Sequence, residues 1–277
     1  MVSVGRWGIT LLTAVLGFAS DNVLTHEENK AGWVLLFDGR SMRGWCDPAK
    51  ENPPADSWAI EDGCLTTRAK PRIAEDLVST ESYGDFELVF DWRLQARGNT
   101  GVKYRIQRQV FVDNSKAQTG PGGFEGMIFR ELNKPLSARA RLAPDASAQV
   151  YTIGFEMQLL DDAGHADAKN GPRYRTGALY GMIAPNATPA RPAGEWNSGR
   201  ILVRRGHIEH WINGTKVLDG SLADPGIQEG AQKRWGLYPP IVEMLTRPKP
   251  EGPICLQHHG DKVWFRNLKI RRRPDSR

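Results

Sequence analysis

An alternation of large apolar side chains with mostly polar ones over residues 85–94 constrains the fold of this chain more than any other feature. The even-numbered positions are large and apolar: Phe86, Leu88, Phe90, Trp92 and Leu94. The positions between them include Glu87, Asp91 and Arg93. Because successive side chains of a strand point to opposite faces of a sheet, this period of two predicts a strand with one buried and one polar face.

Comparable strand patterns follow one another from residue 32 onward. They cover residues 33–37, 58–67, 85–94, 101–106, 153–161, 178–183, 201–218, 254–259 and 263–270. Glu61-Asp62-Gly63 and Asn213-Gly214 mark two hairpin turns, since these residues adopt positive φ at low cost. The sequence shows no sustained helical periodicity. We therefore predict an all-β protein, an antiparallel β-sandwich of two stacked sheets.

Two stretches interrupt this series of strands. Residues 107–150 contain Gly120-Pro121-Gly122-Gly123, and residues 221–253 are rich in proline. Long loop insertions of this kind are uncommon in compact domains unless they cover or build a site. A disordered surface excursion is the alternative. The chain has 277 residues, of which 40% are hydrophobic, and this favours a single domain, expected over residues 31–273.

The first 20 residues have the pattern of an export signal. Arg6 precedes an apolar run over residues 7–19, and a polar stretch begins at Ser20. This order predicts a signal peptide over residues 1–20 and a periplasmic or extracellular location, with a buried N-terminal helix as the alternative. Other segments fall short of the roughly 20 apolar residues that a membrane helix needs, so no stable membrane span is expected in the mature chain.

The charge of the chain gives no sign of a nucleic-acid partner. The formal net charge of +5 comes from scattered Lys and Arg residues, with one dense run at residues 269–273 that we interpret as a solvated edge or tail. Nucleic-acid binding requires basic residues interleaved with exposed aromatics, whereas most aromatics here alternate with apolar residues as core positions. We expect no nucleic acid to bind.

The cysteine content excludes a disulfide scaffold. Cys46, Cys64 and Cys255 allow at most one disulfide. Cys46 and Cys64 are close enough in sequence to pair in an oxidising compartment, or each is a small buried hydrophobe. Zinc-binding spacings such as CxxC and HExxH do not occur in the sequence.

Strand parity gathers polar residues on one face of the predicted sheet. With Val102, Tyr104 and Ile106 assigned to the core, Lys103 and Arg105 face outward. The same sorting of two later strands adds four polar residues to this face: Glu156, Gln158, Gln257 and His259. If these strands share one sheet, the polar residues converge on a single surface, where Glu156 and Gln158 lie about 7 Å apart.

This surface has the groups required for acid–base chemistry on a carbohydrate. Glu156 is a candidate general base or acid, His259 is its counterpart, and Arg105 is a candidate cation beside a developing oxyanion. The amides of Gln158, Gln257 and, in the turn before the strand, Asn99 are suited to hold sugar hydroxyls. A solvated sheet face with weak ion pairs is the alternative.

A turn rich in ligand-type groups follows at residues 161–167. It contains Asp161, Asp162, His165 and Asp167. We expect Asp162 and His165 to contact the substrate, and a divalent cation is a candidate cofactor here. The spacing does not match the twelve-residue calcium loop, and a hydrogen-bonded turn in which Asp162 caps backbone amides is the alternative.

A histidine and a tryptophan in the strand after residue 201 are assigned to opposite faces. His210 alternates with Ile208 and Ile212, and we interpret it as a hydrogen-bonded interior histidine. Trp211 either stacks on a sugar ring or covers the sheet, and its sequence environment favours neither.

A series of short phrases spans nearly everything after residue 31. They lie at residues 32–39, 44–45, 83–88, 154–158, 160–162, 176–180, 194–197, 210–214, 254–257 and 264–267. In this order the phrases resemble the 3-keto-disaccharide hydrolase domain family, and so many ordered phrases are far more specific than one motif. The chain departs from the family at Asn99-Thr100-Gly101, where Asn-Ser-Gly is usual, and in the longer insertion at 107–150.

The resemblance implies a concanavalin A-like jelly-roll sandwich that acts on glycosides with a ketone at C3. It also implies that Tyr180, within the phrase at 176–180, contacts the substrate. A C3 ketone makes the C2 proton acidic, so a base forms an enolate that expels the C1 substituent; the reaction stops there or water adds for net hydrolysis. Glu156 or His259 would transfer protons, and Arg105 or a bound cation would stabilise the enolate oxygen.

Two other functions compete with this hypothesis. A non-catalytic carbohydrate-binding module would use the same face, with Glu156 accepting hydroxyl protons. A catalytic Glu156 is expected to have a perturbed pKa beside a cation in a closed pocket, whereas a lectin-like face is shallow and rich in aromatics. A conventional glycosidase needs two carboxylates, and Gln158 is an amide where the second would be convenient.

Overall fold

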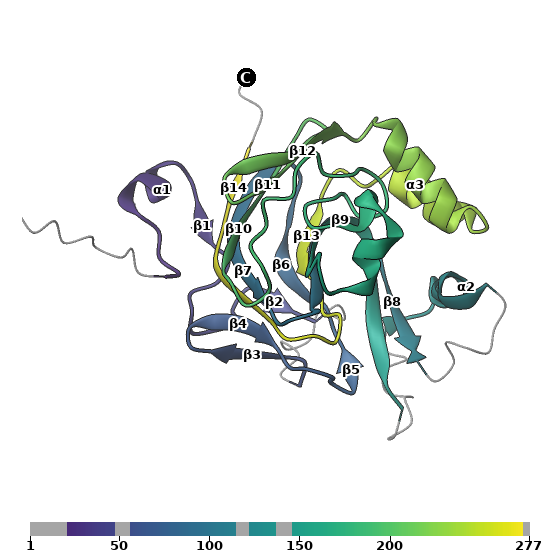
Figure 1. Ribbon diagram of the computed structural model, residues 1–277, viewed down its shortest axis with the longest axis horizontal. Coiled ribbons are helices and arrows are strands. Elements are labelled where there is room, and N and C mark those ends of the chain that lie inside the picture. The colour runs from purple at the N-terminus through teal and green to yellow at the C-terminus, as the bar shows by residue number, and fades with distance from the viewer. Residues whose placement is uncertain (1–20, 48–55, 115–121, 137–145, 274–277) are drawn as a thin grey trace, which may run out of the picture.

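The computed structural model describes residues 21–47, 56–114, 122–136 and 146–273, and it contains two facing sheets (Figure 1). The larger sheet has the order β12 (Thr215–Ser221), β11 (His207–Ile212), β10 (Asn197–Arg204), β7 (Phe86–Leu94), β14 (Val263–Arg272), β4 (Cys64–Thr67) and β3 (Trp58–Glu61), and β1 (Val34–Leu35) also pairs with β14. The smaller sheet has the order β2 (Trp45–Cys46), β6 (Leu77–Tyr83), β13 (Gly252–Leu256), β8 (Asn99–Asp113), β9 (Ala148–Leu160) and β5 (Ile73–Ala74).

The strand pairing confirms the predicted antiparallel β-sandwich. Neighbouring strands in the described residues pair antiparallel, except β5 and β9, which are parallel. Both predicted hairpins are present, since Glu61 pairs with Cys64 and Ile212 pairs with Thr215. The turn residues Asp62 and Asn213, and the glycine after each, have positive φ, as the tight turns require.

The predicted core face is also confirmed. The five apolar residues of β7 are at most 2% exposed and face the apolar side chains of the smaller sheet. Tyr104 of β8 and Phe155 of β9 are among the largest fully buried side chains. One continuous core therefore lies between the sheets and leaves the other face of the smaller sheet to form a site.

Both insertions contain helices, although the sequence showed helical periodicity only as short candidates in the loops. β8 extends to Asp113 and β9 begins at Ala148, so the first insertion is shorter than predicted; it contains α2 (Gly123–Glu131). The second contains α3 (Pro225–Trp235) and α4 (Pro239–Thr246). Each of these two helices begins with proline, which is favourable in a first helical turn, so the proline content indicated helix starts rather than a loop. α2 and α3 lie beside the smaller sheet (Figure 1).

A bulge in β8 overturns part of the parity assignment. Tyr104 pairs with Phe155 and Arg108 pairs with Ile153, so three residues of β8 stand opposite the single residue Gly154. Arg105 has a φ of 51°. Ile106, predicted to enter the core, packs instead against Cys46, Val78 and Cys255 on the outer face of the sheet. A bulge re-aims side chains in this way because the extra residues break the alternation.

Two further expectations need correction. Residues 178–183 form isolated bridges through Leu179 rather than a strand. The basic run at 269–273 is not a solvated tail, because it belongs to β14 and its end. There Lys269 pairs with Glu28 at 2.7 Å, and Arg271 pairs with Glu87 at 2.7 Å.

The described part of the chain begins at Asp21. The predicted signal peptide over residues 1–20 lies outside it. The side-chain oxygens of Asn22 and Asn267 each accept the backbone N–H of the other residue, at 2.7 and 2.8 Å. Within the described residues, no helix is long and apolar enough to span a bilayer. All three cysteines are buried, and no disulfide joins Cys46 to Cys64.

Candidate functional site

Glu156 lies at the centre of a buried polar group on the outer face of the smaller sheet. The residue opposite it on β8 is Lys103, whose Nζ lies 3.8 Å from Glu156 Oε2. The side chain of Glu156 is 11% exposed and that of Lys103 is 2% exposed. Burial raises the pKa of the Glu156 carboxyl, and Lys103 opposes this rise.

Two amides complete the surroundings of the Glu156 carboxylate. Amide orientations are assigned from hydrogen-bond partners. This assignment has Gln158 Nε2 and Gln257 Nε2 donating to Glu156 Oε1 at 3.1 and 3.2 Å. One oxygen of the carboxylate is thus held by two donors, while the other faces Lys103. This fixes the direction of the carboxylate, as a catalytic base requires.

Lys103 is held as a cation beneath the site. Its Nζ lies 3.6 Å from Asp76 Oδ2, donates to the Thr152 carbonyl at 3.4 Å and donates to Gln257 Oε1 at 3.2 Å. Burial alone would lower the pKa of Lys103, but Asp76 and Glu156 raise it well above its usual value. Lys103 therefore stays protonated and orients Glu156 and Gln257.

Gly101 on β8 makes the space that Glu156 occupies. A Cβ added at Gly101 would lie 2.2 Å from Glu156 Oε1 and 2.6 Å from its Cγ. A side chain at position 101 is therefore incompatible with this position of Glu156. The glycine of the Asn99-Thr100-Gly101 phrase serves close approach rather than an unusual backbone angle, because its φ is not positive.

Glu156 lies where two cavities meet. The polar cavity contains Lys103, Gln158, Gln257, Asn99 and His259 in its wall. The aromatic cavity, with a volume of about 280 Å³, lies toward α3 and includes Tyr174 and Trp235 in its wall. Four residues line both cavities: Tyr151, Glu156, Tyr180 and Arg234. The two cavities form one continuous site around the carboxylate.

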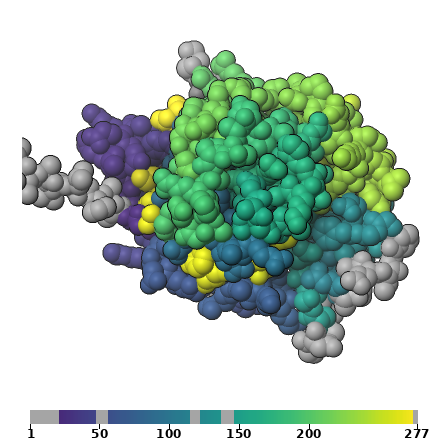
Figure 2. All heavy atoms as spheres, in the orientation of Figure 1, coloured from purple at the N-terminus to yellow at the C-terminus, as the bar shows by residue number. Residues whose placement is uncertain are grey.

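The connection from β9 to β10 covers this side of the molecule and supplies part of the site. Residues of this connection, in green, occupy much of the face in view in Figure 2. It contains the 3₁₀ helices η3 (Ala166–Asn170) and η4 (Pro172–Tyr174). The backbone N–H of Tyr180 donates to the Glu156 carbonyl at 3.0 Å, and its hydroxyl donates to Asp167 at 3.4 Å. Burial raises the pKa of Tyr180, so its hydroxyl remains protonated.

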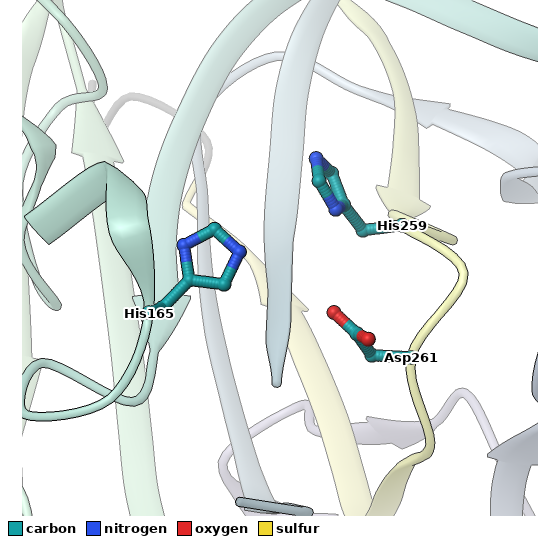
Figure 3. A group of neighbouring side chains, drawn as sticks. All are labelled: His165, His259 and Asp261. Carbon is teal, nitrogen blue, oxygen red and sulfur yellow. The ribbon is translucent and has the colours of Figure 1, made fainter. Parts of the chain in front are cut away.

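Three ligand-type residues meet at one edge of the polar cavity. Figure 3 shows the His165 ring pointing toward His259 and Asp261, which lie on the loop after β13. One ligand atom of each lies within 4.8 Å of those of the other two. Asp261 also accepts the backbone N–H of Asn99 at 3.0 Å. The surrounding protein lowers the pKa of His259, so its ring is neutral near pH 7.

A divalent cation fits this trio only in part. Two imidazoles and a carboxylate are a suitable donor set. However, Nδ1 of His165 accepts the backbone N–H of Asp167 at 3.1 Å, which keeps the proton of the neutral ring on Nε2. A cation on Nε2 would require the other tautomer and the loss of this hydrogen bond. In the present arrangement His165 Nε2 acts as a hydrogen-bond donor.

The structure brings most of the predicted site residues together. Those that line the polar cavity are Glu156, His259, Gln158, Gln257, Asn99, Lys103 and Tyr180. His165 stands beside His259, with the ring centroids 6.0 Å apart. The convergence predicted from strand parity is therefore correct for Glu156, Gln158, Gln257 and His259.

Two predicted site residues lie elsewhere. The bulge turns Arg105 away from the cavities, so that its guanidinium contacts Asp85 and the Lys249 carbonyl at 3.4 and 3.3 Å. Asp162 lies outside both cavity walls and accepts the backbone N–H of Thr176 at 3.0 Å, which is the capping alternative. Asp161 accepts the backbone N–H groups of Ala163 and Gly164 in the same turn and that of Arg97 before β8.

Arg234 is the cation that the sequence analysis missed. It lies on α3, its Nε donates to Glu125 of α2 at 3.2 Å, and its guanidinium lies 5.7 and 5.6 Å from the ring centres of Tyr151 and Tyr180. Arg234 lines both cavities, whereas the sequence analysis expected Arg105 to be the cation of the site. No local pattern indicated Arg234, because residues 221–253 were predicted to be a loop. A loop has no periodicity from which the direction of a side chain can be predicted.

Two other histidines have structural roles. His210 is fully buried, where its Nδ1 donates to the Gly177 carbonyl and its Nε2 accepts the Tyr104 hydroxyl, both at 2.9 Å. The predicted interior histidine is confirmed. Nε2 of His258 donates to the carbonyls of Ser57 and Arg68, which anchors the loop that carries His259.

The chain is similar to known proteins over most of its length. The sequence pattern of the 3-keto-alpha-glucoside-1,2-lyase-like domain matches residues 32–271. A 3-keto-disaccharide hydrolase of Bacteroides thetaiotaomicron is 28% identical over 254 residues, which cover 87% of this chain and 78% of that protein.

Solved structures agree in fold. A candidate glycosyl hydrolase of Parabacteroides distasonis superposes with a TM-score of 0.65 and 28% identity, over 91% of this chain and 99% of the other. A second such protein of the same organism gives a TM-score of 0.52 at 22% identity, over 87% and 99% of the chains, and supports the fold alone.

Proposed function

Since the chain belongs to the 3-keto-alpha-glucoside-1,2-lyase-like domain family, we propose that it cleaves glycosides whose sugar ring carries a ketone at C3. The observation that carries this proposal is the buried Glu156 carboxylate, which is held by two amides and Lys103 at the meeting point of two cavities. The Bacteroides thetaiotaomicron relative, named a 3-keto-disaccharide hydrolase, supports the same chemistry.

Glu156 is assigned as the base that removes the C2 proton. The electrons of the C2–H bond move toward the C3 oxygen and form an enolate, which then breaks the C1–O bond. The leaving oxygen takes a proton. If water adds across the resulting double bond, with hydroxyl at C1 and hydrogen at C2, the net reaction is hydrolysis. A raised pKa makes Glu156 a stronger base than an exposed carboxylate.

The two oxygens that gain charge require different donors. We assign the ketone oxygen to the polar cavity, where Asn99 and His259 are available. The leaving oxygen is assigned to Arg234 and Tyr180, which both cavities share. Asn99 and His259 thus take the role at the enolate oxygen that the sequence analysis gave to Arg105, whereas Arg234 acts at the leaving oxygen. A divalent cation on His165, His259 and Asp261 would polarise the ketone.

The enclosed site favours an enzyme over a carbohydrate-binding module. Gln158 and Lys103 are 1% and 2% exposed, whereas a lectin-like surface is expected to be shallow. A conventional glycosidase is less consistent with the arrangement, because Asp76 is 1% exposed and engaged by Lys103. Asp167, the other carboxylate of the polar cavity wall, accepts hydrogen bonds from Asn99 and Tyr180.

The test is release of the C1 substituent from a 3-keto-glucoside and from its unoxidised parent, with and without a chelator. We expect release from the keto form alone, and a loss of roughly 10²- to 10⁴-fold in Glu156→Gln. The product distinguishes hydrolysis from elimination that stops at the unsaturated sugar. Loss on chelation, restored by added metal, would show that the reaction requires a cation. Binding of both compounds without release would support the carbohydrate-binding module.

A further inference from the structure

The aromatic cavity has no role in the removal of the C2 proton. It extends from Glu156 toward α3 and is built from the covering connection, β9 and both long insertions. Its ring-bearing wall residues include Tyr151, Tyr174 and Tyr180, which are all partly exposed. The rings of Tyr174 and Tyr180 meet edge to face, with centroids 5.3 Å apart. The insertions therefore complete a second compartment beside the carboxylate.

Close packing holds this compartment open. α3 approaches the covering connection at Gly230, where an added Cβ would lie 2.5 Å from the Gly181 carbonyl oxygen and 2.9 Å from Met182 Cα. The contact between Arg234 and Glu125 joins α3 to α2 at 3.2 Å. A cavity whose walls are fixed by backbone contact and a partly buried ion pair is preformed for a ligand.

The chemistry of the wall matches a sugar ring. Partly exposed aromatic faces can stack on the C–H groups of a pyranose, and the same wall carries Glu125, Lys233 and Arg234, whose charged ends can bind hydroxyls. The volume of about 280 Å³ is close to the lower end of the roughly 300–1,000 Å³ of small-molecule sites. The size of this space suits one sugar ring, whereas a methyl group would leave most of it unfilled.

We propose that the aromatic cavity is the subsite for the leaving group and that it binds a second sugar ring. This rests on the proposed function, because the ring whose C2 meets Glu156 must direct its C1 substituent into a neighbouring space. Tyr174 is the specificity-determining residue for that second ring. It belongs to the aromatic cavity alone, whereas Tyr151, Tyr180 and Arg234 also line the polar cavity.

The test compares two substrates that share the first ring and its anomeric configuration. One is a 3-keto-disaccharide and the other is the methyl 3-keto-glycoside. In Tyr174→Ala we expect kcat/KM to fall about tenfold more for the disaccharide than for the methyl glycoside. Tyr174→Phe keeps the ring and should retain most of the disaccharide activity. Leu237→Ala, at an 84% exposed position, is the surface control.

Equal losses for both substrates in Tyr174→Ala, or no loss for either, would overturn the subsite. A binding experiment separates this result from failure of the proposed function. Calorimetric titration with the unoxidised disaccharide and the unoxidised methyl glycoside requires no chemistry. Tighter binding of the disaccharide that disappears in Tyr174→Ala would keep the sugar subsite even if no keto-glycoside is cleaved. Equal binding of both by the wild type would count against it.

Discussion

At the residue scale, the chemistry of Glu156 depends on Lys103. The two side chains face each other on adjacent strands in a buried environment, so each changes the charge preference of the other. Asp76, on the far side of Lys103, allows the cation to remain buried. The balance between burial and Lys103 therefore sets the pH at which Glu156 becomes a base.

Replacement of Lys103 should move the pH profile of the reaction. Burial raises the pKa of Glu156 and Lys103 lowers it, so Lys103→Met is expected to raise that pKa further. The acidic limb of kcat/KM then shifts to higher pH, because more of Glu156 is protonated at a given pH. Lys103→Arg keeps the charge and should leave the limb closer to that of the wild type. If the acidic limb of kcat/KM is unchanged in a folded Lys103→Met variant, a group other than Glu156 titrates on this limb.

A methyl group at position 101 should displace the base without removing it. In Gly101→Ala the new Cβ would lie 2.2 Å from Glu156 Oε1 in the present geometry, so the carboxylate must move. A misplacement of about 1 Å costs on the order of 100-fold in rate, and we expect kcat to fall by about that factor. Gly220→Ala in β12, a position that lines neither cavity, is the matched control. Similar losses in both variants would indicate a general effect of added methyl groups.

At the element scale, a buried histidine joins both sheets and the covering connection. His210 of β11 bonds to the Tyr104 hydroxyl of β8 and to the Gly177 carbonyl of the connection. Both bonds require the neutral ring with its proton on Nδ1. Burial lowers the pKa of His210 to about 4. This histidine therefore couples the assembly of the sandwich to pH.

The free energy of unfolding should fall as the solution becomes acidic. The unfolded chain binds a proton at its ordinary pKa near 6.5, whereas folded His210 binds one only near pH 4. The stabilising effect is thus complete above pH 6.5 and lost toward pH 4. Between pH 7.5 and 4.5 this residue contributes a decrease of about 2 to 3 kcal/mol.

The comparison uses urea unfolding at the two pH values. His210→Gln keeps a donor and an acceptor but cannot titrate. Its free energy of unfolding should therefore fall by less than that of the wild type, and the difference should equal the contribution of His210. His26→Gln, on the exposed surface of α1 (His26–Lys30), should behave like the wild type. A wild-type decrease that persists unchanged in His210→Gln would assign the pH dependence to other groups.

At the scale of the whole molecule, the walls of the site come from parts of the chain that are distant in sequence. β8, β9 and the loop after β13 supply the polar floor, while the connection from β9 to β10 and the two insertions supply the aromatic wall. The core lies on the opposite face of the smaller sheet. This separation lets the insertions vary the leaving-group compartment without disturbing the sandwich.

We propose that the protein is exported and that residues 1–20 are removed in the process. The charged, apolar and small-residue order of this segment supports the proposal. We expect the protein recovered from the periplasm or medium to begin near Ser20, measured by N-terminal sequencing and intact mass. A chain lacking residues 1–20 is the control and should remain in the cytoplasm. Recovery of the wild-type protein in the cytoplasm with its N-terminus intact would contradict export.

The sequence by itself determined the class of fold and most of the polar cavity. Alternation in β7, β8 and β9 identified the core face, and it placed Lys103, Glu156 and Gln158 together on the other. The hairpin turns followed from Asp62-Gly63 and Asn213-Gly214. These features succeeded because strand parity and turn chemistry are local: each depends on a few consecutive residues.

Only the tertiary structure decided which cation enters the site. The bulge at Arg105 depends on how β8 pairs with a distant strand, and it removed Arg105 from the surface that parity predicted. Arg234 replaced it because α3 packs against the covering connection at Gly230. Pairing irregularities and helix docking arise from contacts between residues far apart in sequence. The period of a single strand carries no information about them.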